Sequence, residues 1–314
     1  MSQGKVLFVS SWPKRFKYPV DQYNYPLVRY RKKLLAQGLE LEFLNVKTTS
    51  LVGIDWNTYS NFRAVFLDGR QLTKVAELSE VLLEIRAAKL RIILFDHGDD
   101  VRFYFPEAQD QVDLYVKRQV SNKEVLSKKV ILGWDYRYIS FAPFKWLRYL
   151  EVYYCIPVSK YLRKILLQVP KNKDWFCAVG VGHHDKDIAE KRKTSTDTFM
   201  RIYDVENINV SRLGYLFGLR RSRYCWSPSG FGSFCLRDVE SLFLRTVPVK
   251  EPGSAPFWSD TSRDFGSSII NLSPKFSFGD NDALPEFPDE DWFDFSGITF
   301  CDTLLRLVQK LDLN

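Results

Sequence analysis

No run of apolar residues in the 314-residue chain is long enough to cross a membrane as a helix. The apolar segment at the start of the chain is also too short for a signal peptide, and it continues into a predicted strand. The five cysteines, an odd number, occur singly and form no Cys-x-x-Cys pair. Such spacing predicts reduced thiols. We therefore expect a cytoplasmic protein without a membrane span.

Three short motifs that identify common enzyme classes are also missing. Without a G-x-x-x-x-G-K-[ST] loop, a P-loop nucleotidase or kinase is not expected. Without G-x-G-x-x-G after the first predicted strand, a dinucleotide dehydrogenase is not expected either. The order Ser229-Gly230-Phe231-Gly232 is not the G-x-S-x-G elbow of α/β-hydrolases.

What the chain does contain is enough apolar material for large cores. Hydrophobic residues make up 45% of it and aromatic residues 15%, which excludes a disordered or low-complexity chain. The length suits one large domain or two of ordinary size. With 45 basic and 38 acidic residues, the net charge of +7 suits a nucleotide or a nucleic acid and does not decide between them.

The first half alternates compact apolar runs with amphipathic segments. Strands are predicted at residues 5–10, 39–46, 63–67, 90–95, 113–119 and 130–133, and helices from Pro26 to about Gly38 and over residues 75–89. This alternation predicts a doubly wound α/β sheet, in which ligands collect at the carboxyl ends of the strands. Polar loops follow Ser10, the strand before Asp68 and the strand before Asp96. Their carboxylates are either general bases or ordinary turn and cap residues.

The second half is predicted to repeat this architecture. Residues 175–181 form an expected strand that leads into Gly182-His183-His184-Asp185, and a polar helix is expected from Lys186 to about Arg201. A strand at residues 207–210 and a helix or turn at 214–220 are expected next. We predict an N-terminal domain over residues 1–145 and a C-terminal domain over 146–297, with an irregular aromatic crossover near 139–154. A final helix within residues 298–314 is expected to pack back on the first domain.

The most specific stretch runs from Arg221 to Lys250. It is expected to form a strand at residues 224–226, a Gly/Ser loop at 227–233, a helix from Phe234 and a strand at 246–249. A glycine loop that enters a helix N-terminus presents free N–H groups and the positive end of the helix dipole, and both suit a phosphate. Arg237 and Glu240 share one face of that helix, where they can hold a diphosphate and a sugar hydroxyl.

This stretch resembles the donor domain of exostosin-like glycosyltransferases and related GT-B enzymes. The resemblance lies in Ser227-Pro228-Ser229-Gly230-Phe231-Gly232, then Arg237 and Glu240, then Val247-Pro248-Val249, about thirty residues in all. Leu244-Arg245 departs from the small glycine often found before the last strand. The resemblance implies two Rossmann-like domains that face a cleft. It also implies a hexosyl- or pentosyltransferase that moves a sugar from a UDP- or GDP-linked donor to a glycan hydroxyl.

The resemblance also implies roles for particular residues. Arg237 would bind the diphosphate and Glu240 the ribose or sugar hydroxyls. The remaining donor-binding residues would be Gly182, His183, Ser227, Ser229, Gly230, Gly232 and Ser233. No metal or other cofactor is required, because cationic side chains and helix dipoles can stabilise the leaving diphosphate. If the reaction inverts, a base is expected among Asp99, Asp96, His97 and Asp21, in that order.

Two other functions stay open. The basic and aromatic stretch from Lys14 to Lys33 suits a glycosyltransferase that acts on DNA bases, although an exposed helix and loop have the same composition. A non-catalytic nucleotide- or sugar-binding protein would keep the same fold. A metal site at His183-His184-Asp185 is less favoured, because adjacent histidines on an extended chain point in opposite directions.

Overall fold

The structure is a computed structural model that describes residues 4–12, 18–19, 24–46, 51–69, 78–96, 103–117, 120, 127–132, 142–154, 156–180, 185–229, 235–251, 270–271 and 298–311. These residues form two compact units. The first holds the described residues up to 132 together with 298–311, and the second holds those from 142 to 271. Within these ranges, no helix has the length and apolar character needed to cross a membrane.

The first unit contains a six-stranded sheet in the order β2-β1-β3-β4-β5-β6. All neighbouring strands in it are parallel. Its strands are β1 (Gly4–Ser10), β2 (Leu39–Asn45), β3 (Ala64–Asp68), β4 (Arg91–Asp96), β5 (Leu114–Lys117) and β6 (Val130–Leu132). The prediction of a parallel α/β sheet is therefore confirmed, with strand positions close to those expected from the apolar runs.

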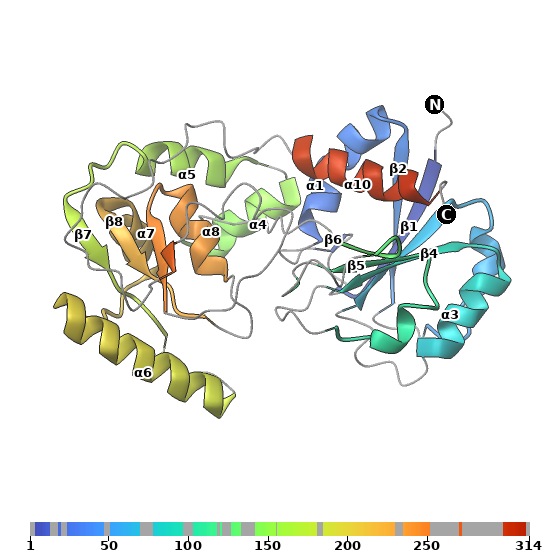
Figure 1. The fold of residues 1–314 in the computed structure, drawn as a ribbon. Helices are drawn as coiled ribbons and strands as arrows, with labels where there is room; N and C mark the ends of the chain where they lie inside the picture. The colour runs from blue at the N-terminus through green and yellow to red at the C-terminus, as the bar shows by residue number, and fades with distance from the viewer. Residues whose placement is uncertain are drawn as a thin grey trace. The chain divides into compact units, whose positions relative to one another are not determined.

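Helices cover both faces of this sheet (Figure 1). α1 (Tyr25–Ala36) and α10 (Ile298–Lys310) pack on one face, and α3 (Leu78–Ala87) packs on the other. Successive side chains of a strand point to opposite faces: Val6 and Phe8 join the core under α1 and α10, while Leu7 and Val9 join the core under α3. Two short 3₁₀ helices, Trp56–Tyr59 and Pro106–Ala108, complete the regular structure described in this unit.

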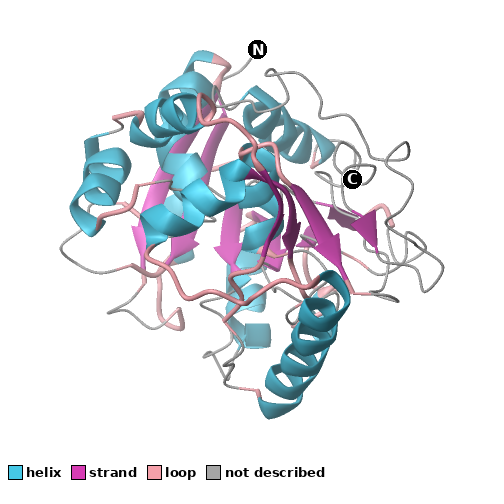
Figure 2. Cartoon of the chain, turned by 90° about the vertical axis from the view of Figure 1, so that its left-hand side faces the viewer, coloured by secondary structure: helices cyan, strands magenta, loops and turns pink. Residues whose placement is uncertain are grey.

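The second unit contains a parallel sheet of four strands in the order β10-β9-β8-β7. Its strands are β7 (Lys173–Phe176), β8 (Ser222–Trp226), β9 (Val247–Lys250) and β10 (Ile270–Asn271). The helices α5 (Val158–Leu166), α7 (Arg212–Arg221) and α8 (Leu236–Phe243) contribute to the core on one face, and α6 (Lys186–Tyr203) to the core on the other. Figure 2 shows strands with helices on both sides.

The segment expected to be irregular near residues 139–154 contains a helix instead, α4 (Lys145–Tyr154). Its carboxylate Glu151 is 1% exposed. Glu151 accepts hydrogen bonds from the backbone N–H and the hydroxyl of Ser159, each at 2.7 Å, in the first turn of α5. α4 therefore supplies the cap that Pro157, the residue before α5, cannot provide with its own side chain.

Two strand predictions in the second unit were also wrong in detail. β7 ends at Phe176, five residues before the expected end at 181, and residues 207–210 are not a strand. The backbone N–H of Ile208 makes one strand-like bond of 3.0 Å to the carbonyl of Cys177. The hydrogen bonds to the N–H and carbonyl of Val179 come from the Asn207 side chain and not from a strand backbone. Asparagine favours such local side-chain bonds over regular strands.

At the end of this sheet where the strands begin, Lys171 lies just before β7. It binds Ser222, the first residue of β8, and Thr246, the residue before β9. Its ammonium donates to the carbonyl of Ser222 and, at 3.2 Å, to the hydroxyl of Thr246. Burial, followed by the charges of Arg220, Arg223 and Arg245, lowers the pKa of Lys171 to about 7.

Candidate functional site

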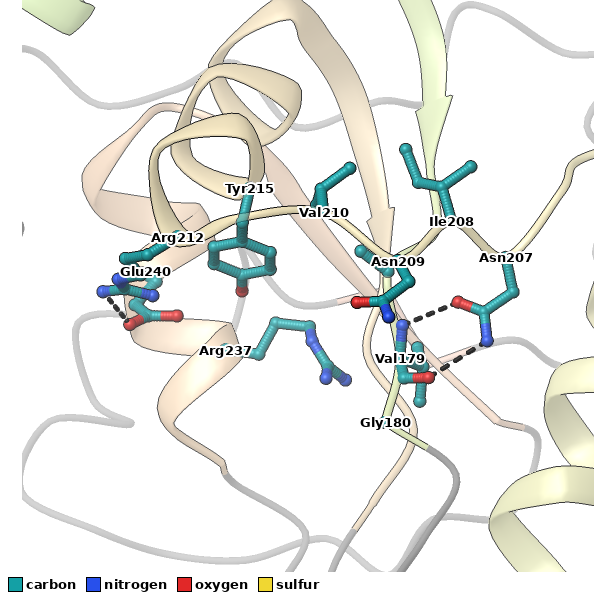
Figure 3. Close-up of a pocket in the computed structure, with 11 residues that line it drawn as sticks. Val179, Gly180, Asn207, Ile208, Asn209, Val210, Arg212, Tyr215, Arg237 and Glu240 are labelled. Atoms are coloured by element: carbon teal, nitrogen blue, oxygen red, sulfur yellow. Dashed lines mark hydrogen bonds and ion pairs between the residues drawn. The ribbon is translucent and has the colours of Figure 1, made fainter. Parts of the chain in front are cut away.

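A pocket of about 610 Å³ opens in the second unit, next to the chain that leaves β7. Its size falls within the range of small-molecule sites. The lining comes from the β7 exit, the loop at 207–210, the first turn of α7 and the first two turns of α8 (Figure 3): Ala178, Val179, Gly180, Asn207, Ile208, Asn209, Val210, Arg212, Tyr215, Arg237 and Glu240. Arg237 and Glu240, which the sequence predicted to act together, therefore line one pocket.

Arg237 extends its guanidinium between the α7 side and the β7 side of this pocket (Figure 3). Its Nε is buried and has no hydrogen-bond partner. Its side chain is half-buried, and no carboxylate of the described residues forms an ion pair with it. A guanidinium that is partly removed from water and forms no ion pair favours an anionic ligand with several oxygen acceptors.

Arg192 of α6 brings a second cation to the same region. Its Nη1 donates to the carbonyl of Gly180 at 3.3 Å, and its Nε and Nη2 donate to the carbonyl of Ser229, both at 3.4 Å. It therefore connects the chain leaving β7 with the chain leaving β8. Burial, and then the positive charge of Arg237, lower the pKa of Arg192, against smaller opposing effects of Cys235 and of the Glu251 carboxylate. The two guanidinium groups therefore lie close enough to interact.

Glu240 lies at the other end of the pocket and is 4% exposed. Its Oε1 accepts a bond of 2.6 Å from Nη2 of Arg212, the first residue of α7. Its Oε2 has no hydrogen-bond partner among the described residues. The carboxylate is thus charge-balanced through one oxygen, which leaves the other available to a ligand.

Tyr215 stands one turn after Arg212 on α7 and also lines the pocket. Its hydroxyl points toward the space between Glu240 and Arg237 (Figure 3) and makes no hydrogen bond within the described part of the chain. Burial and then the charge of Glu240 raise its pKa well above the ordinary value of a tyrosine. The phenol therefore keeps its proton and can both donate and accept a hydrogen bond.

The wall on the β7 side is fixed by Asn207. Its Oδ1 accepts from the backbone N–H of Val179 at 2.8 Å, and its Nδ2 donates to the carbonyl of the same residue at 3.0 Å. These two hydrogen bonds take the place of those that a neighbouring strand would make. They hold residues 207–210 against the chain that leaves β7. The adjacent Asn209 is exposed, and its side chain lines the pocket.

A buried polar cluster fixes the start of α8 and therefore the position of Arg237. Asp238 accepts from the Ser227 hydroxyl at 2.6 Å, from the Cys235 backbone N–H at 2.7 Å and from the Lys250 ammonium at 2.6 Å. These three partners come from the β8 exit, the residue before α8 and the end of β9. The first turn of α8 is thereby tied to two strands.

The predicted donor-binding residues divide into three groups. Arg237 and Glu240 line the pocket. Ser229 accepts a hydrogen bond from Arg192 through its carbonyl, and its Oγ is buried without a partner. The Ser227 hydroxyl is fully buried and donates to Asp238. Gly182, His183, Gly230, Gly232 and Ser233 lie outside the described residues; in sequence they closely follow Gly180 and Ser229.

Of the predicted catalytic residues, only Asp96 belongs to the described part of the chain, and it lies in the first unit. Its Oδ2 accepts from the Tyr115 hydroxyl at 2.7 Å and from the Tyr104 backbone N–H at 3.1 Å, and it pairs with the buried Lys117 ammonium at 3.1 Å. So many donors suit a carboxylate that fixes the end of β4. Asp99, His97 and Asp21 lie outside the described residues.

The neighbouring strand end holds a second buried carboxylate, Asp68. It accepts from the Ser10 hydroxyl at 2.6 Å and from the Asn24 amide at 2.7 Å. The three loops that the sequence singled out in the first half therefore begin at neighbouring strands, β1, β3 and β4. In the ranges that the structure describes, no three His, Cys, Asp or Glu side chains gather in a way that could hold a metal ion.

Sequence reasoning missed four residues of the site: Arg192, Arg212, Tyr215 and Asn207. None of them belongs to a recognisable motif. Arg192 is one of several basic residues on the polar helix α6, and Asn207 fell within a predicted strand. One local signal was present for α7, because Ser211 caps it by accepting from the N–H of Gly214 at 3.2 Å. That cap places Arg212 and Tyr215 in the first turn.

Comparisons with known proteins do not assign a family. No protein-family model matches the chain, and no curated protein matches it significantly. Solved structures that are similar in part include a galactofuranose binding protein, with 11% identity over 80% of this chain and 76% of that one and a TM-score of 0.27. Sucrose-phosphate synthase from Thermosynechococcus elongatus is 10% identical over 98% of this chain and 90% of that one, with a TM-score of 0.39.

A LacI family transcriptional regulator from Arthrobacter sp. FB24, in complex with lactose, is 5% identical over 88% of this chain and 84% of that one, with a TM-score of 0.24. These three TM-scores are too low to establish a common overall arrangement. The chain is an α/β protein with a six-stranded parallel sheet, and the exostosin-like resemblance stays a prediction.

Proposed function

We propose that the chain is a glycosyltransferase whose second unit binds a nucleotide-sugar donor. The observation that carries the proposal is the guanidinium of Arg237, which lines a pocket, forms no ion pair with a described carboxylate and has a buried Nε without a partner. Arg192 adds a second cation nearby. A diphosphate supplies the charge and the oxygen acceptors that two guanidinium groups require. The Gly/Ser loop predicted from the sequence precedes the same helix.

The transfer itself would need no metal. Arg237 and Arg192 would stabilise the negative charge that develops on the leaving diphosphate. The acceptor would be a glycan hydroxyl. In an inverting reaction, its proton would go to a base from the first unit, with Asp99, Asp96, His97 and Asp21 as the residues to test. Because Asp96 already accepts from several buried donors, its replacement is expected to cost stability as well.

The test is thermal unfolding in the presence of UDP, GDP, ADP and CMP, followed by titration with the nucleotide that stabilises most. Arg237→Met keeps much of the side chain's volume but removes the charge. It should weaken diphosphate binding about 10- to 100-fold, which corresponds to about 1.5–3 kcal/mol for charge-assisted hydrogen bonds. Arg223→Met is the matched control, because Arg223 is exposed and pairs with Asp174 at the opposite end of the sheet.

If no nucleotide stabilises the protein, or if both variants bind equally well, the proposal is wrong. Nucleotide binding combined with an absence of donor hydrolysis and of transfer to any glycan acceptor would instead assign a non-catalytic binding protein.

A further inference from the structure

The first turn of α7 places two polar side chains at the Glu240 end of the pocket. Arg212 and Tyr215 are three residues apart, which puts them on one face of the helix. The Arg212 guanidinium also lies 5.4 Å from the centroid of the Tyr215 ring. Neither residue belongs to the sequence motif that suggested a donor site.

We propose that the Tyr215 hydroxyl binds a sugar hydroxyl next to the one that the resemblance assigns to Glu240, and that Arg212 is the positioning residue that fixes the Glu240 carboxylate for this purpose. The proposal rests on the proposed function, because it names how that donor site would read a sugar. The ring would be either the ribose of the nucleotide or the sugar that it carries.

The hydrogen-bonding capacity of the two groups matches a pair of neighbouring hydroxyls. Glu240 Oε2 can only accept, and it has no described partner. The Tyr215 hydroxyl can donate and accept, and it keeps its proton because burial and then Glu240 raise its pKa. A vicinal diol offers two donors and several acceptors, so one hydroxyl can donate to Glu240 while the other pairs with Tyr215.

Arg212 gives Glu240 its orientation. With the carboxylate 4% exposed, a single bond of 2.6 Å to Oε1 both balances the charge and selects which oxygen faces the pocket. The described charged and titratable groups near this carboxylate are Arg212 and Tyr215 from α7 and Arg237 from α8 itself. Without Arg212, the buried carboxylate would lose both its ion-pair partner among the described residues and the bond that fixes its orientation.

The experiment measures binding of UDP and GDP against their 2′-deoxy and 3′-deoxy forms, and of UDP-glucose against UDP. If the ring is the ribose, the wild type should prefer the ribonucleotide over each deoxy form by about three- to tenfold, the value of one hydrogen bond. If the ring is the transferred sugar, UDP-glucose should bind more tightly than UDP by at least a similar factor. Tyr215→Phe, which keeps the ring, should abolish the preference at one ribose position and keep it at the other, or should reduce the preference for UDP-glucose by about the value of one hydrogen bond.

Arg212 is tested by the same preferences at neutral pH. In Arg212→Met, the preference for the hydroxyl that Glu240 binds should fall toward unity, because the carboxylate loses the bond that orients it. Arg212→Lys, which restores a positive charge, should recover part of that preference. A purely structural Arg212 would change the unfolding temperature without changing the preference. Arg223→Met serves again as the control.

The possible failures can be told apart. If the wild type binds no nucleotide, the proposed function fails and this inference fails with it. If the wild type binds a nucleotide but shows neither preference, or if Tyr215→Phe keeps the preference in full, only the hydroxyl subsite is wrong. If Arg212→Met keeps the wild-type preferences in full, the positioning role of Arg212 is wrong.

Discussion

The ion pair between Lys250 and Asp238 allows a quantitative test of how the start of α8 is held. The side chains are 2% and 0% exposed, and their charged atoms are 2.6 Å apart. Lys250→Met removes the ammonium and leaves a buried carboxylate with only two neutral donors, the Ser227 hydroxyl and the Cys235 N–H. Breaking a buried pair on one side costs about 3–5 kcal/mol, because the remaining charge is uncompensated. We expect this loss in the free energy of unfolding.

Urea denaturation followed by tryptophan fluorescence measures this loss, since Trp226 is buried on the adjacent strand β8. Two further variants separate the mechanism from a general effect of mutation. The double variant Lys250→Met/Asp238→Asn removes both charges and should recover a large part of the loss. Arg223→Met breaks an ion pair of 3.4 Å whose partners are 63% and 69% exposed, so it should cost no more than about 1 kcal/mol.

The same pair has a defined pH range. Burial, the largest single effect, acts to lower the pKa of Lys250, but Asp238 and Cys235 outweigh it and the pKa is raised above 10.5. The contribution to stability is therefore fully present below about pH 10.4, the pKa of an unfolded lysine, and is lost only at higher pH. A Lys250→Met variant as stable as Arg223→Met at neutral pH would refute the reasoning, because the Asp238 carboxylate would then not depend on its counter-charge.

Three other predictions concern the second unit. A Cβ on Gly218 of α7 would lie 2.1 Å from the buried Phe176 ring, so Gly218→Ala should destabilise by about 1–3 kcal/mol despite its better helix propensity. Gly214→Ala in the same helix meets nothing closer than 3.4 Å and should be neutral or slightly stabilising in the same thermal unfolding experiment. Burial and nearby arginines lower the pKa of Lys171 to about 7 in the folded chain. Above that pH the folded chain has lost the Lys171 proton, whereas the unfolded chain still binds it. The unfolding temperature should therefore rise between pH 7 and 9 more steeply than in Lys171→Met, and equal slopes would contradict this. Asn207→Ala should cost about 1–3 kcal/mol in urea denaturation, because it leaves the N–H and carbonyl of Val179 without their partner, and Asn207→Asp, which keeps one of the two bonds, should lie between it and the wild type.

The local patterns of the sequence determined the secondary structure of the first unit. Its strands are short runs such as Val6 to Val9, in which every residue is buried, and this burial on both faces is what a parallel sheet under helices requires. The glycine at position 38 takes a positive φ of 88° just after Gln37, the C-cap of α1, as a helix C-terminus favours. These features depend on neighbours in the chain, so periodicity is sufficient to find them.

The sequence also placed Arg237 and Glu240 on one helix face, because a spacing of three residues fixes their relative direction. Only the tertiary structure decided what surrounds them. Arg212 is 28 positions away from Glu240, and Arg192 is 37 positions away from Ser229. Asn207 replaces a predicted strand by binding Val179 with its side chain. Such contacts depend on how helices and loops pack across a sheet, and no local pattern of residue types encodes that packing.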